Sequence, residues 1–434
     1  MFTAFIVLIV ILAYVWLLYP GIVLLAPRKK KADQSLPELG DDAPLIAIVF
    51  SAHDEEKVIG ARLANLTSLD YPYDRLAIVV GMDGCTDRTE SIVREWASFD
   101  PRIHTARSDS CQGKTRMLKQ LVEQVLKGRG GEGFSENPKA SPSSTTQQPK
   151  NVLPPPHFLI FTDANTTFER DAVRWLVTPF SDPRVGGVCG KLVFVERGRD
   201  GIPNPESESQ NGSDGPPSRS NEPAYWNWET RIKESESRLD SCLGANGAIY
   251  AIRSELFPLT MPDNVIIDDF VIGMKVREQG FRMVFEPAAV AREDLPESIQ
   301  NEWRHRVRIG AGAFQALALC RACLSPRYGL FAWIFWSHKV LRWFTPHMLC
   351  AVVVIGCWFL ARWGWKTEDY VVNLTAVGAM SAFVFCLVMA GLSPRFKKRL
   401  DQVVYFLTMQ AALLAGFIKF CRGNLSGKWE RTER

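Results

Sequence analysis

Apolar residues gather in long blocks at the two ends of the chain, and the middle is polar with only short apolar runs. Residues Phe2–Ala26 contain no charged side chain, and this block is long enough to cross a bilayer core of about 30 Å. Three similar blocks lie near the other end, at about Phe344–Leu360, Tyr370–Leu392 and Val403–Phe420. The pattern predicts an N-terminal transmembrane anchor at residues 1–27 and three transmembrane helices within residues 344–421.

Basic residues beside these blocks indicate their orientation. Arg28–Lys31 follow the first block directly, and the basic run Arg395–Arg399 separates the last two. The positive-inside rule places both segments, and therefore the polar middle, in the cytoplasm. With one membrane helix before the polar middle and three after it, the basic tail, residues 422–434, would lie outside the cytoplasm, which conflicts with the rule. Either the tail is an exception or residues 328–343 also cross. Their pattern favours an amphipathic helix, and we expect interfacial helices over residues 313–343.

The polar middle has the pattern of an alternating α/β unit. Three short apolar runs have the length of buried parallel strands: Leu45–Phe50, Leu76–Val80 and Phe158–Phe161. Helical spacing between the first two runs, at Ile59, Leu63 and Leu66, predicts strand–helix–strand units in one twisted, mostly parallel sheet. Ligands bind beyond the carboxyl ends of the strands in such sheets, so we expect the functional residues there.

Composition narrows the class of protein. Of the 434 residues, 47% are hydrophobic and 23% charged, which excludes a disordered chain. The net charge of +4 gives no indication of nucleic-acid binding. Ten cysteines are scattered singly apart from Cys320 and Cys323, a pattern that favours buried, reduced thiols in a cytoplasmic body. Residues 128–156 and 198–223 are rich in Gly, Ser, Pro, Asn and Gln, and we expect flexible surface insertions there.

Acidic residues follow each predicted strand. Asp54 and Glu55 come after the first, Asp83 after the second, and Asp163 with Asn165 after the third. A single Asp at such a position is more often a helix cap or turn residue, but three in register favour a ligand site. Their oxygens suit Mg²⁺ or Mn²⁺ bound together with a nucleotide diphosphate. The sequence has neither a Walker A motif nor a convincing GxGxxG, which weighs against a P-loop NTPase or a dinucleotide enzyme.

The order and spacing of several short motifs resemble the inverting family 2 glycosyltransferases, in particular the membrane-anchored branch of hyaluronan, chitin-oligosaccharide, cellulose and poly-N-acetylglucosamine synthases. The motifs are Ser51–Glu56, Leu69–Pro72, Met82–Thr89, Gly113–Lys114, Asp163–Asn165, Gly244–Ala248 and Asp268–Asp269. The resemblance runs from about Pro44 to Gly312. It implies a GT-A-like fold: an α/β, Rossmann-type nucleotide-sugar domain over residues 40–312, flanked by transmembrane helices.

The resemblance implies a role for most of these acidic residues. Asp54, Glu55 and Asp83 would line the nucleoside pocket, with Asp83 nearest the uracil or ribose. Asp163 and Asn165 match the metal-binding DxD triplet, here with an amide in the third position. A metal held there would be Mg²⁺ or Mn²⁺.

The pair Asp268–Asp269 matches the acidic pair whose second member is the catalytic base. Asp269 would remove the proton of the attacking hydroxyl, so that an α-linked donor gives a β-linked product. The alternative is that Asp269 is a helix N-cap before residues 270–279. Lys114 would lie near the nucleotide and offset phosphate charge, unless it is a solvated lysine at a helix start.

Two further segments fit the acceptor or diphosphate region. The small residues around Gly244, Asn246 and Gly247 would form a tight loop against which an acceptor sugar can lie. Three arginines at alternate positions would assist the diphosphate or contact lipid phosphates: Arg304, Arg306 and Arg308. Processive relatives carry QxxRW here, and the aligned residues 305–309 retain only the arginine.

Three hypotheses follow. The first is an integral membrane enzyme with a cytoplasmic catalytic domain, in the inner or plasma membrane of a bacterium. Its partners would be a nucleotide-sugar donor, a UDP-sugar by the resemblance, a glycan or lipid acceptor, and the lipid bilayer. The second transfers one sugar to a lipid or polyprenyl-phosphate acceptor, which the lost QxxRW favours. The third is a non-catalytic nucleotide-binding scaffold, against which Asp163, Asp269 and Lys114 argue.

Overall fold

The computed structural model of the protein describes residues 1–26, 36, 40, 42–128, 154–195, 222–294, 299–364, 394–423 and 425. The two expected insertions, at 128–156 and 198–223, lie almost wholly outside these residues, as does most of the basic tail. The expected membrane helix Tyr370–Leu392 lies outside them altogether.

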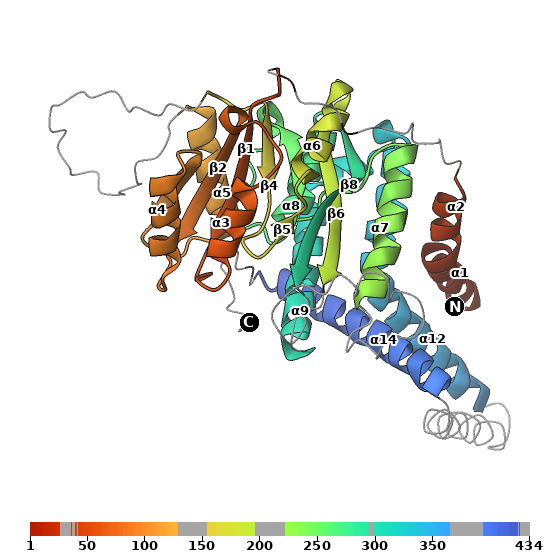
Figure 1. The fold of residues 1–434 in the computed structure, drawn as a ribbon. Coiled ribbons are helices and arrows are strands. Elements are labelled where there is room, and N and C mark those ends of the chain that lie inside the picture. Colours follow the sequence, from red (N-terminus) through yellow and green to blue (C-terminus); the bar gives the residue numbers. More distant parts are fainter. Residues whose placement is uncertain are drawn as a thin grey trace.

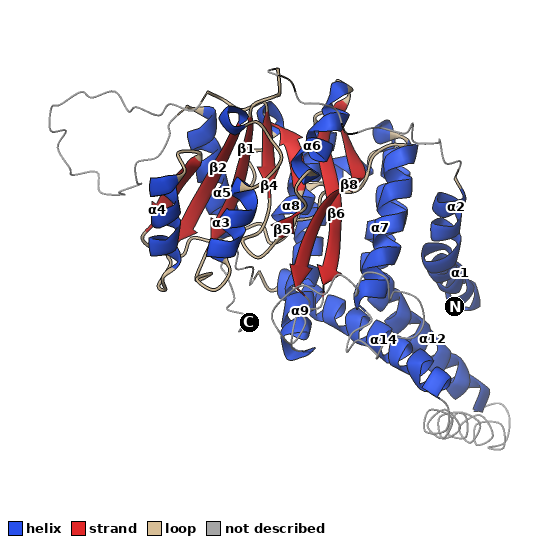
Figure 2. Cartoon of the chain, in the orientation of Figure 1, coloured by secondary structure: helices blue, strands red, loops and turns tan. Residues whose placement is uncertain are grey.

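An eight-stranded sheet forms the centre of the polar middle, in the order β3-β2-β1-β4-β7-β6-β8-β5 (Figures 1 and 2). Its first four strands are mutually parallel and include the three expected runs: β1 (Ile46–Ala52), β2 (Leu76–Asp83), β3 (Ile103–Ser108) and β4 (Phe158–Phe161). The other four strands are β5 (Thr167–Phe168), β6 (Val185–Val195), β7 (Tyr250–Arg253) and β8 (Arg282–Asp294). β7 runs antiparallel to β4 and β6, and β5 antiparallel to β8. The predicted mostly parallel α/β sheet is confirmed, with these two strands reversed.

Helices cover both faces of the sheet. Successive residues of β1 point to opposite faces, and all seven are buried. Ala47 and Val49 pack against α5 (Lys114–Leu126) and α8 (Asp268–Glu278). Ile48 and Phe50 pack on the other face, against helices that begin after β1, β2 and β5: α3 (Ile59–Thr67), α4 (Thr89–Phe99) and α6 (Ala172–Val177). Continuous apolar strands of this kind are typical of a sheet buried on both sides.

Short helical turns connect several of these elements. The 3₁₀ turns are η2 (Tyr73–Arg75), η3 (Thr178–Ser181), η5 (Ser254–Leu256), η6 (Arg321–Leu324) and η7 (Pro326–Tyr328). The longer helix α7 (Glu222–Leu239) follows β6 and leads into the loop that contains Gly244–Ala248.

Apolar helices lie at the end of the molecule that is far from the β3 edge of the sheet (Figure 1). The N-terminal helix runs through three segments, α1 (Phe2–Ala13), η1 (Tyr14–Leu18) and α2 (Tyr19–Leu25). Within the described ranges, two helices are long and apolar enough to cross a membrane, Phe2–Leu25 and Leu400–Cys421. Two consecutive helical segments, Leu330–Trp343 and Thr345–Phe359, are together also long and apolar enough to cross a membrane, and the angle between them is 56°.

The chain reaches these C-terminal helices through α9 (Ile299–Leu319). It then forms α10 (Leu330–Phe335), the π-helix η8 (Trp336–Val340), α11 (Leu341–Trp343), α12 (Thr345–Gly364) and, beyond undescribed residues, α14 (Pro394–Cys421). α9 packs closely against α14, because a methyl group on Gly416 would lie only 2.6 Å from the backbone nitrogen of Ala311. The helix that follows the sheet is thereby fixed to an apolar helix (Figure 1).

Candidate active site

The acidic residues expected at one rim of the sheet do lie at the ends of adjacent strands. Ala52 of β1 pairs with Met82 of β2, and Val49 of β1 pairs with Phe161 of β4. Asp83 is the last residue of β2, and Asp54 and Asp163 follow the neighbouring strands β1 and β4 by two residues, so all three lie at the same edge of the sheet.

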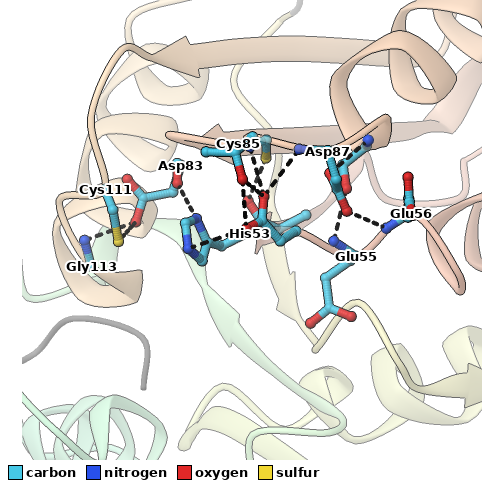
Figure 3. A network of polar contacts seen from close by, with 12 residues as sticks. His53, Glu55, Glu56, Asp83, Cys85, Asp87, Cys111 and Gly113 are labelled. Carbon is cyan, nitrogen blue, oxygen red and sulfur yellow. Dashed lines mark hydrogen bonds and ion pairs between the residues drawn. The ribbon is translucent and has the colours of Figure 1, made fainter. Parts of the chain in front are cut away.

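Asp54 holds the turn that follows β2. Its backbone has a φ of 54°, an uncommon conformation for a residue other than glycine. Its Oδ1 accepts hydrogen bonds from Thr86 N at 2.6 Å and from Asp87 N at 3.3 Å (Figure 3). Asp87 in turn accepts one from Glu56 N at 3.0 Å. The Glu55 side chain points away from this network in Figure 3, and its backbone N–H donates to the Thr89 hydroxyl.

Asp83 holds the start of α5. Its buried carboxylate accepts hydrogen bonds from Gln112 N at 2.7 Å and Gly113 N at 2.8 Å. His53 Nδ1 lies 2.6 Å from the backbone oxygen of Asp83, so the loops after β1 and β2 are joined (Figure 3). The residue that follows Gly113 is Lys114, whose position is therefore fixed from the end of β2.

Lys114 lies between Asp163, of the proposed metal-binding triplet, and the pair Asp268–Asp269. Its Nζ lies 2.6 Å from Asp163 Oδ1 and 4.0 Å from Asp268 Oδ1. Asp163 follows β4, whereas Asp268 and Asp269 form the first turn of α8. Residues about one hundred positions apart in sequence thus meet around one ammonium group.

Gly247 marks the point where the three groups converge. A methyl group on Gly247 would lie 3.3 Å from Asp163 Oδ2, 3.5 Å from Asp269 Oδ2 and 3.7 Å from Lys114 Nζ. The glycine therefore leaves open the space between the two carboxylates. A reacting group placed there would be within reach of both carboxylates and of the ammonium.

Burial and like charge shape the acid–base properties of the pair. Burial, with the neighbouring Asp268 as the next cause, raises the pKa of Asp269 from 3.8 to about 6, while Lys114 opposes the rise. Burial also raises the pKa of Asp268, against the charge of Lys114. Burial lowers the pKa of Lys114, but Asp163 and Asp268 outweigh it, so the net shift is upward. Asp269 is thus a carboxylate that can exchange a proton near neutral pH.

The donors available to a divalent metal are oxygens. Asp163 Oδ2 faces the space beside Gly247, and the Asn165 amide is oriented by donating from Nδ2 to Glu293 Oε1 at 2.6 Å. Within the described part of the chain, no three His, Cys, Asp or Glu residues form a complete metal site. One carboxylate and one amide fit Mg²⁺ or Mn²⁺, which usually fill their remaining positions with water and substrate phosphates.

The small-residue loop is fixed beside this space. Asn246 Oδ1 accepts a hydrogen bond from Ala248 N at 2.9 Å, and the Thr162 hydroxyl donates to Ala248 O at 2.8 Å. The loop therefore has its own internal turn and a tie to the end of β4.

The three arginines of α9 differ in their surroundings. Arg304 is exposed, whereas Arg306 and Arg308 are half-buried. Arg308 is close enough to Asp268 to lower the pKa of that carboxyl in part. Of the three, Arg308 is the one that the structure links to the acidic pair.

Three residues that contribute to the site were not among the predicted site residues. His53 bonds to the chain at Asp83, Glu293 orients Asn165, and Arg62 lies behind Asp163. His53 follows a predicted strand and stands next to Asp54. The other two lie in a helix and near the end of a long strand, where no local pattern distinguishes them.

A twisted α/β sheet with this acidic rim and small-residue loop is the architecture of GT-A-like glycosyltransferases. Residues 43–312 match the family described as "Glycosyltransferase like family 2". The chain belongs to this family.

The chain is similar to several known proteins. It is 25% identical over 285 residues to the probable glycosyltransferase YdaM of Bacillus subtilis, covering 62% of this chain and 56% of the relative. It is 20% identical over 292 residues to the poly-β-1,6-N-acetyl-D-glucosamine synthase of Staphylococcus aureus, covering 66% and 58%. The chain thus spans somewhat over half the length of these relatives.

A solved structure shares the fold of this chain over nearly the whole length of both proteins. It is the mannosyltransferase PcManGT of Pyrobaculum calidifontis in complex with GDP-Man and Mn²⁺, with a TM-score of 0.61 at 21% identity. The match covers 96% of this chain and 99% of the mannosyltransferase. At this level of identity the likeness establishes the fold.

Proposed function

We propose that the protein is a membrane-bound inverting glycosyltransferase that transfers a sugar from a UDP-sugar to a glycan or lipid-linked acceptor, forming a β-glycosidic bond. The observation that carries the proposal is the convergence of Asp163, Asp269 and Lys114 beside Gly247. An inverting transfer needs a base on one side of the sugar and charge stabilisation for the leaving diphosphate on the other.

Asp269 is the proposed base. A hydroxyl is a poor nucleophile, and a carboxylate within hydrogen-bond reach can take its proton as the new bond forms. Its partly buried position raises the pKa of this carboxylate to about 6, so it is ionised at neutral pH yet basic enough to accept a proton. Asp268 contributes to that rise through its own charge.

Asp163 and Asn165 are the proposed holders of a divalent metal. Such a metal, when bound, supplies Lewis-acid stabilisation of the leaving diphosphate. Lys114 stands beside Asp163 and is placed to pair with a phosphate oxygen. Asp54, Glu55 and Asp83 remain the proposed lining of the nucleoside pocket, and in the structure Asp54 and Asp83 also hold its loops.

Membrane attachment through both ends of the chain is part of the proposal. The helices Phe2–Leu25 and Leu400–Cys421 support it by length and composition, and they expose large apolar side chains such as Val10 and Leu407. The basic residues Arg28–Lys31 favour a cytoplasmic location for the catalytic domain.

A second candidate is the transfer of a single sugar to a lipid or polyprenyl-phosphate acceptor. The observation that favours it is the sequence of residues 305–309, in which His305 and Ile309 replace the Gln and Trp of QxxRW. An aromatic platform for a growing glycan is therefore missing from this position of α9.

The proposal is tested by incubating membranes that contain the protein with radiolabelled UDP-sugars and GDP-sugars. Product that depends on Asp269 and extends over many sugars supports glycan synthesis, and product of one sugar on extractable lipid supports the second candidate. Transfer that is equally fast in Asp269→Asn would overturn the assignment of the base. No Asp269-dependent product with any donor would favour the non-catalytic scaffold.

A further inference from the structure

A buried arginine lies behind the Asp163–Asn165 loop. Arg62 belongs to α3 and is only 2% exposed. Its Nη2 donates to Thr162 Oγ1 at 2.7 Å and its Nη1 to Asn65 Oδ1 at 2.8 Å. Its guanidinium lies over the ring of Phe168, 4.4 Å from the centroid.

The contact with Thr162 reaches both loops of the site. The same hydroxyl that accepts from Arg62 donates to Ala248 O at 2.8 Å. Thr162 directly precedes Asp163, and Ala248 directly follows Gly247. One side chain therefore joins Arg62 to the loop of the proposed metal donor and to the loop beside the proposed base.

Asn65 fixes the far end of the same loop. Phe168 N donates to Asn65 Oδ1 at 2.8 Å, and Asn65 Nδ2 donates to Phe168 O at 2.8 Å. Arg62 and Asn65 are three residues apart, so they lie on one face of α3. Between them they hold Thr162 before, and Phe168 after, the segment Asp163–Asn165.

A neutral side chain could make such hydrogen bonds without the cost of burying a charge. A buried guanidinium is expensive unless it is hydrogen-bonded and compensated by negative charge. Burial lowers the pKa of Arg62 to about 9, and the charge of Asp163 opposes that shift. The carboxylate that compensates Arg62 is thus the proposed metal donor itself.

We propose that Arg62 is a positioning residue that acts through Thr162 to fix the Asp163 carboxylate for binding a divalent metal together with a nucleoside diphosphate. The inference rests on the proposed function, because it takes Asp163 as a metal donor. Arg62 has two opposing effects on a bound cation. Its positive charge repels the metal, whereas its hydrogen bonds hold the ligand in place. The proposal is that the second effect dominates.

The test is a titration of the purified full-length protein with Mn²⁺ in the presence of UDP, with free Mn²⁺ followed by electron paramagnetic resonance. The variants are Arg62→Met, Arg62→Lys and Thr162→Val. Arg62→Met and Thr162→Val are each expected to weaken Mn²⁺ binding by about tenfold or more, as losses of supporting contacts to metal ligands do. Thr162→Val changes no charge, so it isolates the effect of position.

Two further results are expected if Arg62 acts through Thr162. The double variant binds Mn²⁺ no more weakly than the weaker of the two single variants, since both changes break the contact between Arg62 and Thr162. Arg62→Lys restores little, because an ammonium cannot reproduce the fork that joins Thr162 and Asn65.

Arg253→Met is the matched control for loss of a packed arginine. Arg253 donates to Val185 O at 2.8 Å and to Phe180 O at 2.9 Å. It pairs with Phe158, at the end of β4 opposite Asp163. We expect this variant to lose thermal stability while its Mn²⁺ affinity stays that of the wild type.

The outcomes separate the inference from the function on which it rests. Unchanged or tighter Mn²⁺ binding by folded Arg62→Met and Thr162→Val would overturn the positioning role. Should Arg62→Met fail to fold, Thr162→Val alone decides. If the wild type itself bound no Mn²⁺ with UDP, the metal part of the proposed function would fall first, and this inference with it.

Discussion

Lys114 Nζ lies 2.6 Å from Asp163 Oδ1, so the proposed metal donor is already paired with an ammonium group. The pair joins the start of α5 to the loop after β4, and Asp268 lies 4.0 Å from the same ammonium. A metal and Lys114 therefore compete for one carboxylate. The diphosphate of the donor offers Lys114 a second anionic partner, so substrate binding would relieve that competition.

Replacing Lys114 by Met is expected to separate metal affinity from donor affinity. Mn²⁺ should bind the nucleotide-free protein more tightly, because Asp163 loses its competitor. The KM for the donor should rise roughly ten- to hundredfold, the worth of a charge-assisted hydrogen bond of about 1.5–3 kcal/mol. Lys119→Met on the same helix is the control, since Lys119 pairs with Asp263 instead. Equal KM values for the two variants would contradict a phosphate contact by Lys114.

Gly247→Ala should impair transfer without unfolding the protein. The added methyl group would lie 3.5 Å from Asp269 Oδ2 and 3.7 Å from Lys114 Nζ, which are ordinary contacts, and 3.3 Å from Asp163 Oδ2, a tight contact that a small side-chain shift relieves. It would displace substrate from this space. We expect kcat/KM to fall by about tenfold or more. Gly60→Ala in α3 is the control, because its methyl would meet only Ile92, at 3.8 Å. Steady-state kinetics and thermal unfolding of both variants check this, and a fully active Gly247→Ala would show that the space is not used.

The pH dependence of transfer should report the ionisation of Asp269. The base works in its ionised form, and the pKa is raised to about 6. The value of kcat/KM should therefore fall about tenfold per pH unit below about pH 6 and level off above it. Asp269→Asn should lower the rate by about 10²–10⁴-fold and abolish this acid limb. An acid limb that persisted in the residual activity of the variant would point to another group.

The same substitution should stabilise the fold at neutral pH. Because the pKa of Asp269 is higher in the folded state than its ordinary value of 3.8, the folded protein binds this proton more tightly than the unfolded chain does. The ionised carboxylate therefore destabilises the fold at pH 7, and this cost is relieved as the pH falls through about 6. Asp269→Asn should raise the free energy of unfolding by on the order of 1–3 kcal/mol, measured at pH 7 without metal. A lower melting temperature for the variant would contradict a net destabilising effect of the Asp269 charge, which Lys114 offsets only in part.

Features of the fold that depend on a local pattern could be predicted from the sequence, whereas features built from distant segments could not. The positions of β1, β2 and β4 were predictable, because continuous apolar runs followed by acidic residues are local patterns, although β2 extends beyond the predicted run to include Asp83. The reversed direction of β7 was not, since a four-residue strand carries no sign of its orientation. The buried position of Arg62 was not predictable either. In the sequence it is one charged residue within a helix, and only the packed fold buries it.

Removing divalent metal should stop transfer while leaving the fold intact. The site offers Asp163 and Asn165, too few protein oxygens to hold a metal tightly without substrate phosphates. We expect EDTA to abolish activity, and added Mn²⁺ or Mg²⁺ to restore it, with little change in melting temperature. Full activity in EDTA would contradict a role for a divalent metal in transfer.

The contact between the catalytic domain and the apolar helices depends on Glu229 of α7. Its carboxylate accepts a hydrogen bond from Arg342 and one from Lys339 Nζ at 3.1 Å, and it lies 3.0 Å from His338 Nε2. Glu229 and Arg342 are both buried. Glu229→Gln would leave Arg342 and Lys339 without this anion, whereas His338 keeps Glu236, which lies 2.5 Å from its Nδ1. Breaking a buried pair such as Glu229–Arg342 costs about 3–5 kcal/mol.

We therefore expect Glu229→Gln to lower the melting temperature in detergent and to expose residues 330–343 to protease. Glu234→Gln on the same helix is the control, because Glu234 pairs with Arg238 at the surface and such a pair is worth about 0–1 kcal/mol. Equal stability of the two variants would mean that the basic groups find other anions. A large loss confined to Glu229→Gln would instead show that one carboxylate of α7 fixes the helices that follow the sheet.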